Sequence, residues 1–267
     1  MHKLSGALLK ETTTLTDQNL ATTASSTPVL VISAVPTELE LLISSLCNPQ
    51  KNTDPVWQVT SGQIDRQQLF CAVAGIGTTN AAAATAVLIE RIRPQIVLNI
   101  GCGGAFAGSE LQVGDLAVAY HEVFADLGVI APEGWLDLSD LGFAMLATAG
   151  DKYYNCIPLD EALANKALYH AQKAGIRAKA GIFATVASCS GTALRGEELL
   201  QRYQPICENM EGAAVAAVCL RYNIPCIELR GISNLVEDRD LTRWNIPLAV
   251  TVAQRAALSL LAEPGLP

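Results

Sequence analysis

The sequence lacks an apolar run of the roughly 20 residues that a membrane-spanning helix needs, because charged residues, Asn or Pro interrupt each candidate. Near the start, charges also break the short apolar patch too early for a secretory signal. Basic residues are scattered and the formal net charge is −8, which argues against nucleic acid and anionic membranes as partners. We therefore expect a cytoplasmic protein that binds a small molecule.

Metal-binding patterns are also missing. The eight cysteines form no CxxC pair, and the three histidines, His2, His121 and His170, lie far apart in the chain. Several cysteines fall inside apolar segments, which is typical of buried thiols in a reducing compartment. We predict no metal and no other cofactor.

Half of the 267 residues are hydrophobic, which is enough for one large core, and the order of apolar segments favours a single α/β domain over residues 28–262. The preceding residues, 1–27, are dominated toward their end by Thr, Ser, Ala and Asn, so we predict a disordered polar tail there.

The most informative stretch runs from Glu208 to Asn234. Ala213–Leu220 is almost entirely small or apolar, which predicts a buried helix with Glu211 at its first turn, where the helix dipole stabilises a negative charge. The following apolar strand ends in polar residues at Asn234, and ligands of α/β sheets gather at such strand ends. Glu211 and Asn234 are therefore candidate site residues; alternatively, they only stabilise a helix end and a turn.

The segments Met210–Ala214 and Arg230–Asn234, about twenty residues apart, together resemble the paired signature of the nucleoside phosphorylase and nucleosidase superfamily. The resemblance covers residues 28–262. It implies a three-layer domain in which helices flank a central mixed, twisted β-sheet, a nucleoside substrate and a homo-oligomer. It also implies that Met210, beside Glu211, contacts the substrate.

Two glycine-rich segments follow predicted strands. The first, Ala74–Asn80, precedes the predicted helix Ala81–Ile92; a dinucleotide site is weakly supported, because Asn80 stands at the third glycine position and no acidic residue ends the next strand. The second, Gly101–Ala105, follows the predicted strand Ile96–Ile100 and is expected to be a turn that lets backbone approach a ligand.

The superfamily resemblance implies substrate contacts in the second glycine-rich segment and in a later segment. It places a nucleoside-contacting loop at the second glycine-rich segment, which implies contacts from Cys102, Gly103 and Gly104 to ribose and base. It places purine contacts in the segment 188–193, which makes Thr192 and Ala193 candidates.

The resemblance also implies the chemistry. Breaking an N-glycosidic bond builds positive charge on ribose and negative charge on the purine. Glu211 would accept hydrogen bonds from the ribose hydroxyls. Adenine-specific members carry Asp where this chain has Asn234, whose amide instead presents an acceptor to a protonated N7 and a donor to a 6-oxo group. We therefore expect a 6-oxopurine.

Water is the expected nucleophile. Phosphorylases of the superfamily usually bring arginines to bind phosphate, whereas here Asn99 stands in the corresponding strand and residues 1–65 contain no arginine. The nucleosidases place a water-activating glutamate where this chain has Pro36. Glu38 is the predicted substitute; alternatively, other groups position the water and Glu38 only stabilises the start of a helix.

The run Asn234–Pro247, with the segment Ser33–Pro36, resembles members that release hypoxanthine from a menaquinone precursor with a carboxyphenyl group on its ribose side chain. Arg239 or Arg243 would bind that carboxylate, or each would only pair with acidic neighbours on the surface. The sequence thus predicts an N-glycosyl hydrolase. The alternatives are another purine nucleosidase, a purine nucleoside phosphorylase, and a nucleoside-binding domain without catalysis.

Overall fold

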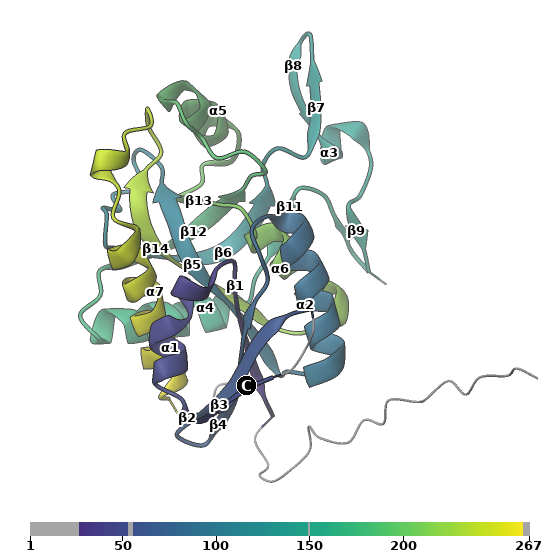
Figure 1. Cartoon of the computed structure of the whole chain (residues 1–267). Coiled ribbons are helices and arrows are strands. Elements are labelled where there is room, and N and C mark those ends of the chain that lie inside the picture. Colours follow the sequence, from purple (N-terminus) through teal and green to yellow (C-terminus); the bar gives the residue numbers. More distant parts are fainter. Residues whose placement is uncertain (1–26, 53–55, 149, 264–267) are drawn as a thin grey trace, which may run out of the picture.

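The computed structural model describes residues 27–52, 56–148 and 150–263 (Figure 1). Almost all of the predicted polar tail, residues 1–26, lies outside these ranges. No helix within the three ranges has the length and apolar character needed to cross a membrane.

Within the described residues, ten strands form one mixed sheet in the order β11-β6-β12-β13-β5-β1-β4-β3-β2, and β14 pairs with both β5 and β6. Because of these two pairings, β5, β13, β12, β6 and β14 form a closed ring at one end of the sheet. The strands are β1 (Val29–Ser33), β2 (Cys47–Lys51), β3 (Gln58–Ile64), β4 (Gln67–Val73), β5 (Ile96–Ala105), β6 (Leu116–Phe124), β11 (Cys156–Pro158), β12 (Ala178–Thr185), β13 (Cys207–Asn209) and β14 (Cys226–Leu235).

Helices cover both faces of the sheet (Figure 1). In β1 the side chains alternate: Val29 and Val31 pack in the cluster that includes α1, α4 and α7, whereas Leu30 and Ile32 pack against α2 and α6. This arrangement confirms the predicted three-layer α/β fold with a central mixed sheet. The helices are α1 (Glu40–Ser44), α2 (Thr78–Ile92), α4 (Glu161–Lys173), α5 (Ala193–Tyr203), α6 (Gly212–Tyr222) and α7 (Ile246–Leu261), with the short 3-10 helices η1 (Pro36–Glu38) and η2 (Leu241–Arg243).

The connection between β6 and β11 carries small elements of its own. The strands β7 (Gly128–Ala131) and β8 (Gly134–Asp137) form an antiparallel hairpin that projects from the body of the protein (Figure 1). The helix α3 (Leu138–Leu141) and the short antiparallel pair of β9 (Leu146–Ala147) and β10 (Lys152–Tyr153) follow.

The predicted turn at Gly101–Ala105 is wrong: these residues continue strand β5, which pairs with β14 as far as Leu235. Glycine is needed at these positions because neighbouring side chains occupy the space that a Cβ atom would take. A Cβ atom at Gly101 would lie 2.6 Å from Arg230 Nη1 and 2.7 Å from Glu38 Oε1. The glycines therefore let side chains of neighbouring elements cross over the strand.

The predicted buried helix after Glu211 is confirmed as α6, which packs against α2 and the ring of strands. Glu211 itself is the residue before the first helical turn, and its carboxylate does not cap α6. That carboxylate is therefore free to take partners from other elements.

Candidate active site

A cavity of about 260 Å³ lies where β1, β5, β13 and β14 end. Seven of the residues predicted from the sequence line it: Glu38, Cys102, Gly103, Gly104, Met210, Glu211 and Asn234. Further lining residues include Ile76, Cys189, Ser190, Glu208, Arg230, Ser233, Trp244 and Ile246. The tertiary structure thus collects these seven predicted residues from four separate stretches of the chain.

The carboxylate of Glu211 is buried and held at both oxygens. Its Oε1 accepts a hydrogen bond from the backbone N–H of Gly77 at 2.9 Å, and its Oε2 lies 3.3 Å from Arg230 Nη1. Gly77 has φ 90°, a backbone conformation that favours glycine. Because a carboxylate oxygen accepts more than one hydrogen bond, Glu211 can still receive bonds from a ligand hydroxyl.

Arg230 is a charged site residue that was not predicted from the sequence. Its guanidinium is 2 % exposed and joins three groups: Nε donates to Glu228 Oε1 at 2.8 Å, and Nη1 donates to Glu211 Oε2 and to the carbonyl of Cys102. Burial alone lowers the pKa of Arg230, but the carboxylates of Glu228, Glu211 and Glu38 outweigh it and raise the pKa above its ordinary value. The signal that could have identified it was a pair of opposite charges, Glu228 and Arg230, inside a largely apolar strand.

Glu38 is buried beside the same arginine. Three backbone N–H groups hold its carboxylate: Ala34 and Val35 donate to Oε2 at 3.1 and 3.2 Å, and Cys102 donates to Oε1 at 3.0 Å. Of about four acceptor positions on a carboxylate, three are occupied. One position remains for a water molecule or a ligand hydroxyl in the cavity.

Asn234 of β14 lines the same cavity, and its two chain neighbours hold its amide in orientation. Ser233 Oγ lies 2.7 Å from Asn234 Oδ1, while Asn234 Nδ2 donates to the carbonyl of Leu235 at 3.0 Å. These contacts leave one lone pair on Oδ1 and one N–H of Nδ2. The side chain therefore presents an acceptor and a donor side by side.

The segment after β12 contributes Cys189 and Ser190 to the cavity rather than the predicted Thr192 and Ala193. Thr192 caps α5 by accepting from Arg195, and Ala193 N donates to Asp238. Their predicted purine contacts thus have no counterpart in the lining.

A buried carboxyl holds the loop after β12 in place. Ser190 donates from both N and Oγ to Glu208, at 2.9 and 2.5 Å. Burial raises the pKa of Glu208 above its usual value, and the two bonds from Ser190 oppose that rise.

The Cys102 side chain is not a nucleophile in this setting. Burial, with the nearby Glu38 carboxylate, raises the pKa of the Cys102 thiol to about 12. The thiol therefore stays protonated at neutral pH.

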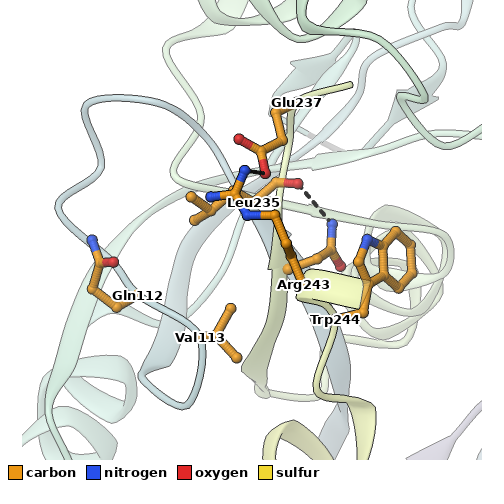
Figure 2. A pocket seen from close by; sticks show the side chains of 7 residues that line it. Gln112, Val113, Leu235, Glu237, Arg243 and Trp244 are labelled. Carbon is orange, nitrogen blue, oxygen red and sulfur yellow. Dashed lines mark hydrogen bonds and ion pairs between the residues drawn. The ribbon is translucent and has the colours of Figure 1, made fainter. Parts of the chain in front are cut away.

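The two predicted carboxylate-binding arginines lie outside the main cavity. Arg243 lines a second cavity of about 230 Å³ that shares Asn234 and Trp244 with the first, and its guanidinium pairs with Glu237. Figure 2 shows this ion pair across from Gln112 and Val113. Arg239 lies outside the lining of both cavities and stacks over the Trp244 ring, 4.7 Å from its centre.

Comparisons with known proteins agree with this geometry. The profile of the phosphorylase superfamily matches residues 28–262. The chain is 36 % identical over 191 residues to futalosine hydrolase of Thermus thermophilus, covering 72 % of this chain and 80 % of that protein. It is 29 % identical over 211 residues to 5'-methylthioadenosine/S-adenosylhomocysteine nucleosidase of Halalkalibacterium halodurans, covering 78 % and 86 %.

A solved structure has the same fold. The nucleosidase of that name from Neisseria meningitidis, in complex with methylthio-immucillin-A, superposes with a TM-score of 0.77 at 21 % identity, over 88 % of this chain and 99 % of the other. This likeness shows the fold. The family match and the two relatives, both of which are N-glycosyl hydrolases, confirm the predicted enzyme class. The chain belongs to the phosphorylase superfamily and is an N-glycosyl hydrolase.

Proposed function

We propose that this enzyme hydrolyses the N-glycosidic bond of futalosine and releases hypoxanthine and dehypoxanthine futalosine, a step in menaquinone biosynthesis. The resemblance of residues 234–247 first pointed to this substrate. The futalosine hydrolase of Thermus thermophilus, at 36 % identity, supports it. The observation that carries the proposal is the fixed amide of Asn234 in the cavity.

The amide of Asn234 matches the edge of a 6-oxopurine. The free lone pair of Oδ1 accepts from a protonated N7, and the free N–H of Nδ2 donates to O6. As the bond to ribose breaks, its electrons move into the purine, which takes a proton from solvent at N7, and electron density also builds up on O6. A donor already oriented there stabilises the leaving group without transferring a proton from Asn234.

Glu211 and Glu38 serve the ribose end. Glu211 accepts hydrogen bonds from the ribose hydroxyls and so stabilises the positive charge that develops on the sugar. Glu38 accepts a hydrogen bond from water at its remaining acceptor position and takes the proton as the water oxygen bonds to the anomeric carbon.

Electrostatics favours water over phosphate as the nucleophile. Among the described lining residues of the cavity, three are glutamates (Glu38, Glu208 and Glu211) and one is an arginine. That arginine, Arg230, is already bound by Glu228 and Glu211. A phosphate dianion would meet uncompensated negative charge, whereas water would not.

The carboxylate of futalosine is assigned to the second cavity. Arg243 is the better candidate because it lines this cavity, while Arg239 is engaged with Trp244. Binding requires Arg243 to exchange Glu237 for the substrate, which an exposed ion pair permits at little cost.

A product assay tests the proposal. Purified protein is incubated with futalosine, inosine and methylthioadenosine, each with and without phosphate, and the released base and sugar are identified. Hypoxanthine from futalosine, independent of phosphate, is expected. Arg243→Ala should then raise KM for futalosine about tenfold or more and leave the reaction with inosine unchanged.

The other outcomes select the alternatives. Adenine from methylthioadenosine alone would identify the other nucleosidase type, and a phosphate requirement would identify a phosphorylase. Binding of 6-oxopurine nucleosides without turnover would identify a nucleoside-binding domain.

A further inference from the structure

Two carboxyl groups that no proposed step uses are buried beneath the active site. Glu122 of β6 and Glu228 of β14 are both fully inaccessible to solvent. A Cβ atom at Gly212 would lie 2.0 Å from Glu122 Oε1 and 2.3 Å from Glu228 Oε2, so the two oxygens face each other under the start of α6. Gly212 follows Glu211 directly, which places the pair next to the active site.

Most oxygens of this pair have a donor. Glu122 accepts from Asn209 Nδ2 at Oε1 and from Thr185 Oγ at Oε2, both at 2.7 Å. Glu228 Oε1 accepts from Arg230 Nε. Glu228 Oε2 is buried and has no donor among the described groups. A buried carboxylate oxygen without a donor is costly, and the group facing it is the Glu122 carboxyl.

A single proton placed between the two carboxyl groups would give Glu228 Oε2 the donor that it lacks. If Glu122 carries a proton on Oε1, that O–H donates to Glu228 Oε2 while still accepting from Asn209, and every oxygen of the pair is satisfied. The local charges also favour a proton on the pair. Arg230 is one cation beside the carboxyl groups of Glu38, Glu211, Glu228 and Glu122, and two adjacent buried carboxylates would repel each other strongly.

We propose that Glu122 and Glu228 share one proton at neutral pH, and that this pair positions Arg230 and, through Arg230, the carboxylate of Glu211. Glu228 fixes the guanidinium at Nε, and the same guanidinium holds Glu211 Oε2 through Nη1. The pair also reaches Glu211 by a second route, since Asn209, which donates to Glu122, accepts from the backbone N–H groups of Glu211 and Gly212. Glu122 and Glu228 are therefore positioning residues.

The shared proton belongs to the carboxyl pair, because no other titratable group among the described residues around Glu122 and Glu228 changes its charge near pH 7. Burial raises the pKa of Glu122 well above its ordinary value, and the charge of Glu228 adds to this rise. The titratable side chains packed around the pair on β11, β13 and β14, apart from Arg230, are thiols, and all have a raised pKa and are neutral at pH 7: Cys156, Cys207 and Cys226. Thr185 of β12 and Asn209 of β13 are uncharged donors.

Infrared spectroscopy tests the shared proton without reference to turnover. The wild-type enzyme at pH 7 should show the C=O stretch of a protonated carboxyl, shifted in D2O, and this band should be absent from Glu122→Gln. Glu208→Gln is the control, because Glu208 is a second buried carboxyl with a raised pKa that contacts neither member of the pair. If the wild type has no such band, or if Glu208→Gln alone removes it, the shared proton is ruled out.

Kinetics tests the positioning role, which rests on Glu211 acting as proposed. Glu122→Gln keeps a neutral donor to Glu228 Oε2 but loses the bond from Asn209 Nδ2, because an amide nitrogen does not accept. It should therefore retain more of kcat than Glu122→Ala and Glu228→Gln, which should lower kcat by about tenfold or more. The wild-type kcat should fall at alkaline pH, as the pair loses its proton, and Glu122→Gln should abolish that fall. Equal losses in Glu122→Gln and Glu122→Ala with an unchanged pH profile would overturn the positioning role, whatever substrate the product assay identifies.

Discussion

At the scale of single residues, the site consists of two carboxylates, Glu211 and Glu38, and one amide, Asn234, each held in a fixed orientation. Glu211 and Glu38 are fixed by backbone N–H groups of other elements, and Asn234 by its two chain neighbours. Side chains that are oriented before the substrate arrives do not have to reorganise during the reaction.

Glu211→Gln should lower kcat about 100-fold or more, because a neutral amide cannot stabilise positive charge on the ribose and its N–H would face Arg230 or Gly77. Steady-state kinetics on the substrate found in the product assay measures the loss. Glu110→Gln, an exposed surface variant, is the matched control and should keep full activity. Full activity in Glu211→Gln would remove Glu211 from the mechanism.

Asn234→Asp should change base preference. A carboxyl can give a proton to N7, which suits adenine, but it repels the electron-rich O6 of hypoxanthine. The ratio of kcat/KM for 6-oxopurine over adenine nucleosides should therefore fall by about tenfold or more. The control Asn165→Asp changes an amide on α4 that bonds Tyr120 at the surface. An unchanged ratio would show that Asn234 does not read the base.

At the scale of elements, strand β5 makes the site possible because it carries no side chain where others must cross. Glu38 from η1 and Arg230 from β14 both approach Gly101, and Cys207 from β13 approaches Gly103 at 2.5 Å from the Cβ position. The site is built over this strand rather than by a loop that follows it.

Gly101→Ala should therefore damage both activity and stability. The added methyl group would displace Glu38 or Arg230, so we expect a loss of about 1–3 kcal/mol in the free energy of unfolding and at least a tenfold loss in kcat/KM. Gly191→Ala is the control, since nothing lies within 4 Å of its Cβ position. Urea denaturation and kinetics measure both; near-wild-type values for Gly101→Ala would refute the spatial argument.

At the scale of the whole molecule, buried carboxyls should make stability depend on pH. Burial raises the pKa of Glu208 in the folded state, so the folded protein binds this proton more tightly than the unfolded chain does. This contribution to stability is complete below the unfolded pKa of about 4.5 and is lost as pH rises through the folded pKa.

Glu208→Gln removes this dependence. The free energy of unfolding of the variant minus that of the wild type should increase between pH 4.5 and 8, with a slope of at most about 1.4 kcal/mol per pH unit. The hydrogen bonds from Ser190 favour the ionised form of Glu208, so the pH-dependent part of their loss is already contained in the pKa shift. Urea denaturation at several pH values measures the difference. A difference that stays constant with pH would mean that Glu208 titrates normally in the folded state.

The oligomeric state is also a property of the whole molecule. The homo-oligomer implied by the superfamily resemblance remains a prediction, to be measured by sedimentation.

Much of this protein could be predicted from the sequence because its signals are local. The apolar run after Glu211 specifies a buried helix wherever it packs, and the polar end of β14 marks a ligand-binding edge. The paired signature around Glu211 and Asn234 then gives the superfamily. Each of these features is encoded within a few neighbouring residues.

Only the tertiary structure decided the rest, because it depends on which strands become neighbours. Glycines in β5 look like a turn until Glu38 and Arg230 are seen to cross them. Arg230 looks like a charge misplaced in a strand until Glu228 of the same strand, Glu211 before α6 and Glu38 of η1 are seen around it. The shared proton proposed for Glu122 and Glu228 requires β6 and β14 to be paired, a contact between distant segments that no local pattern specifies.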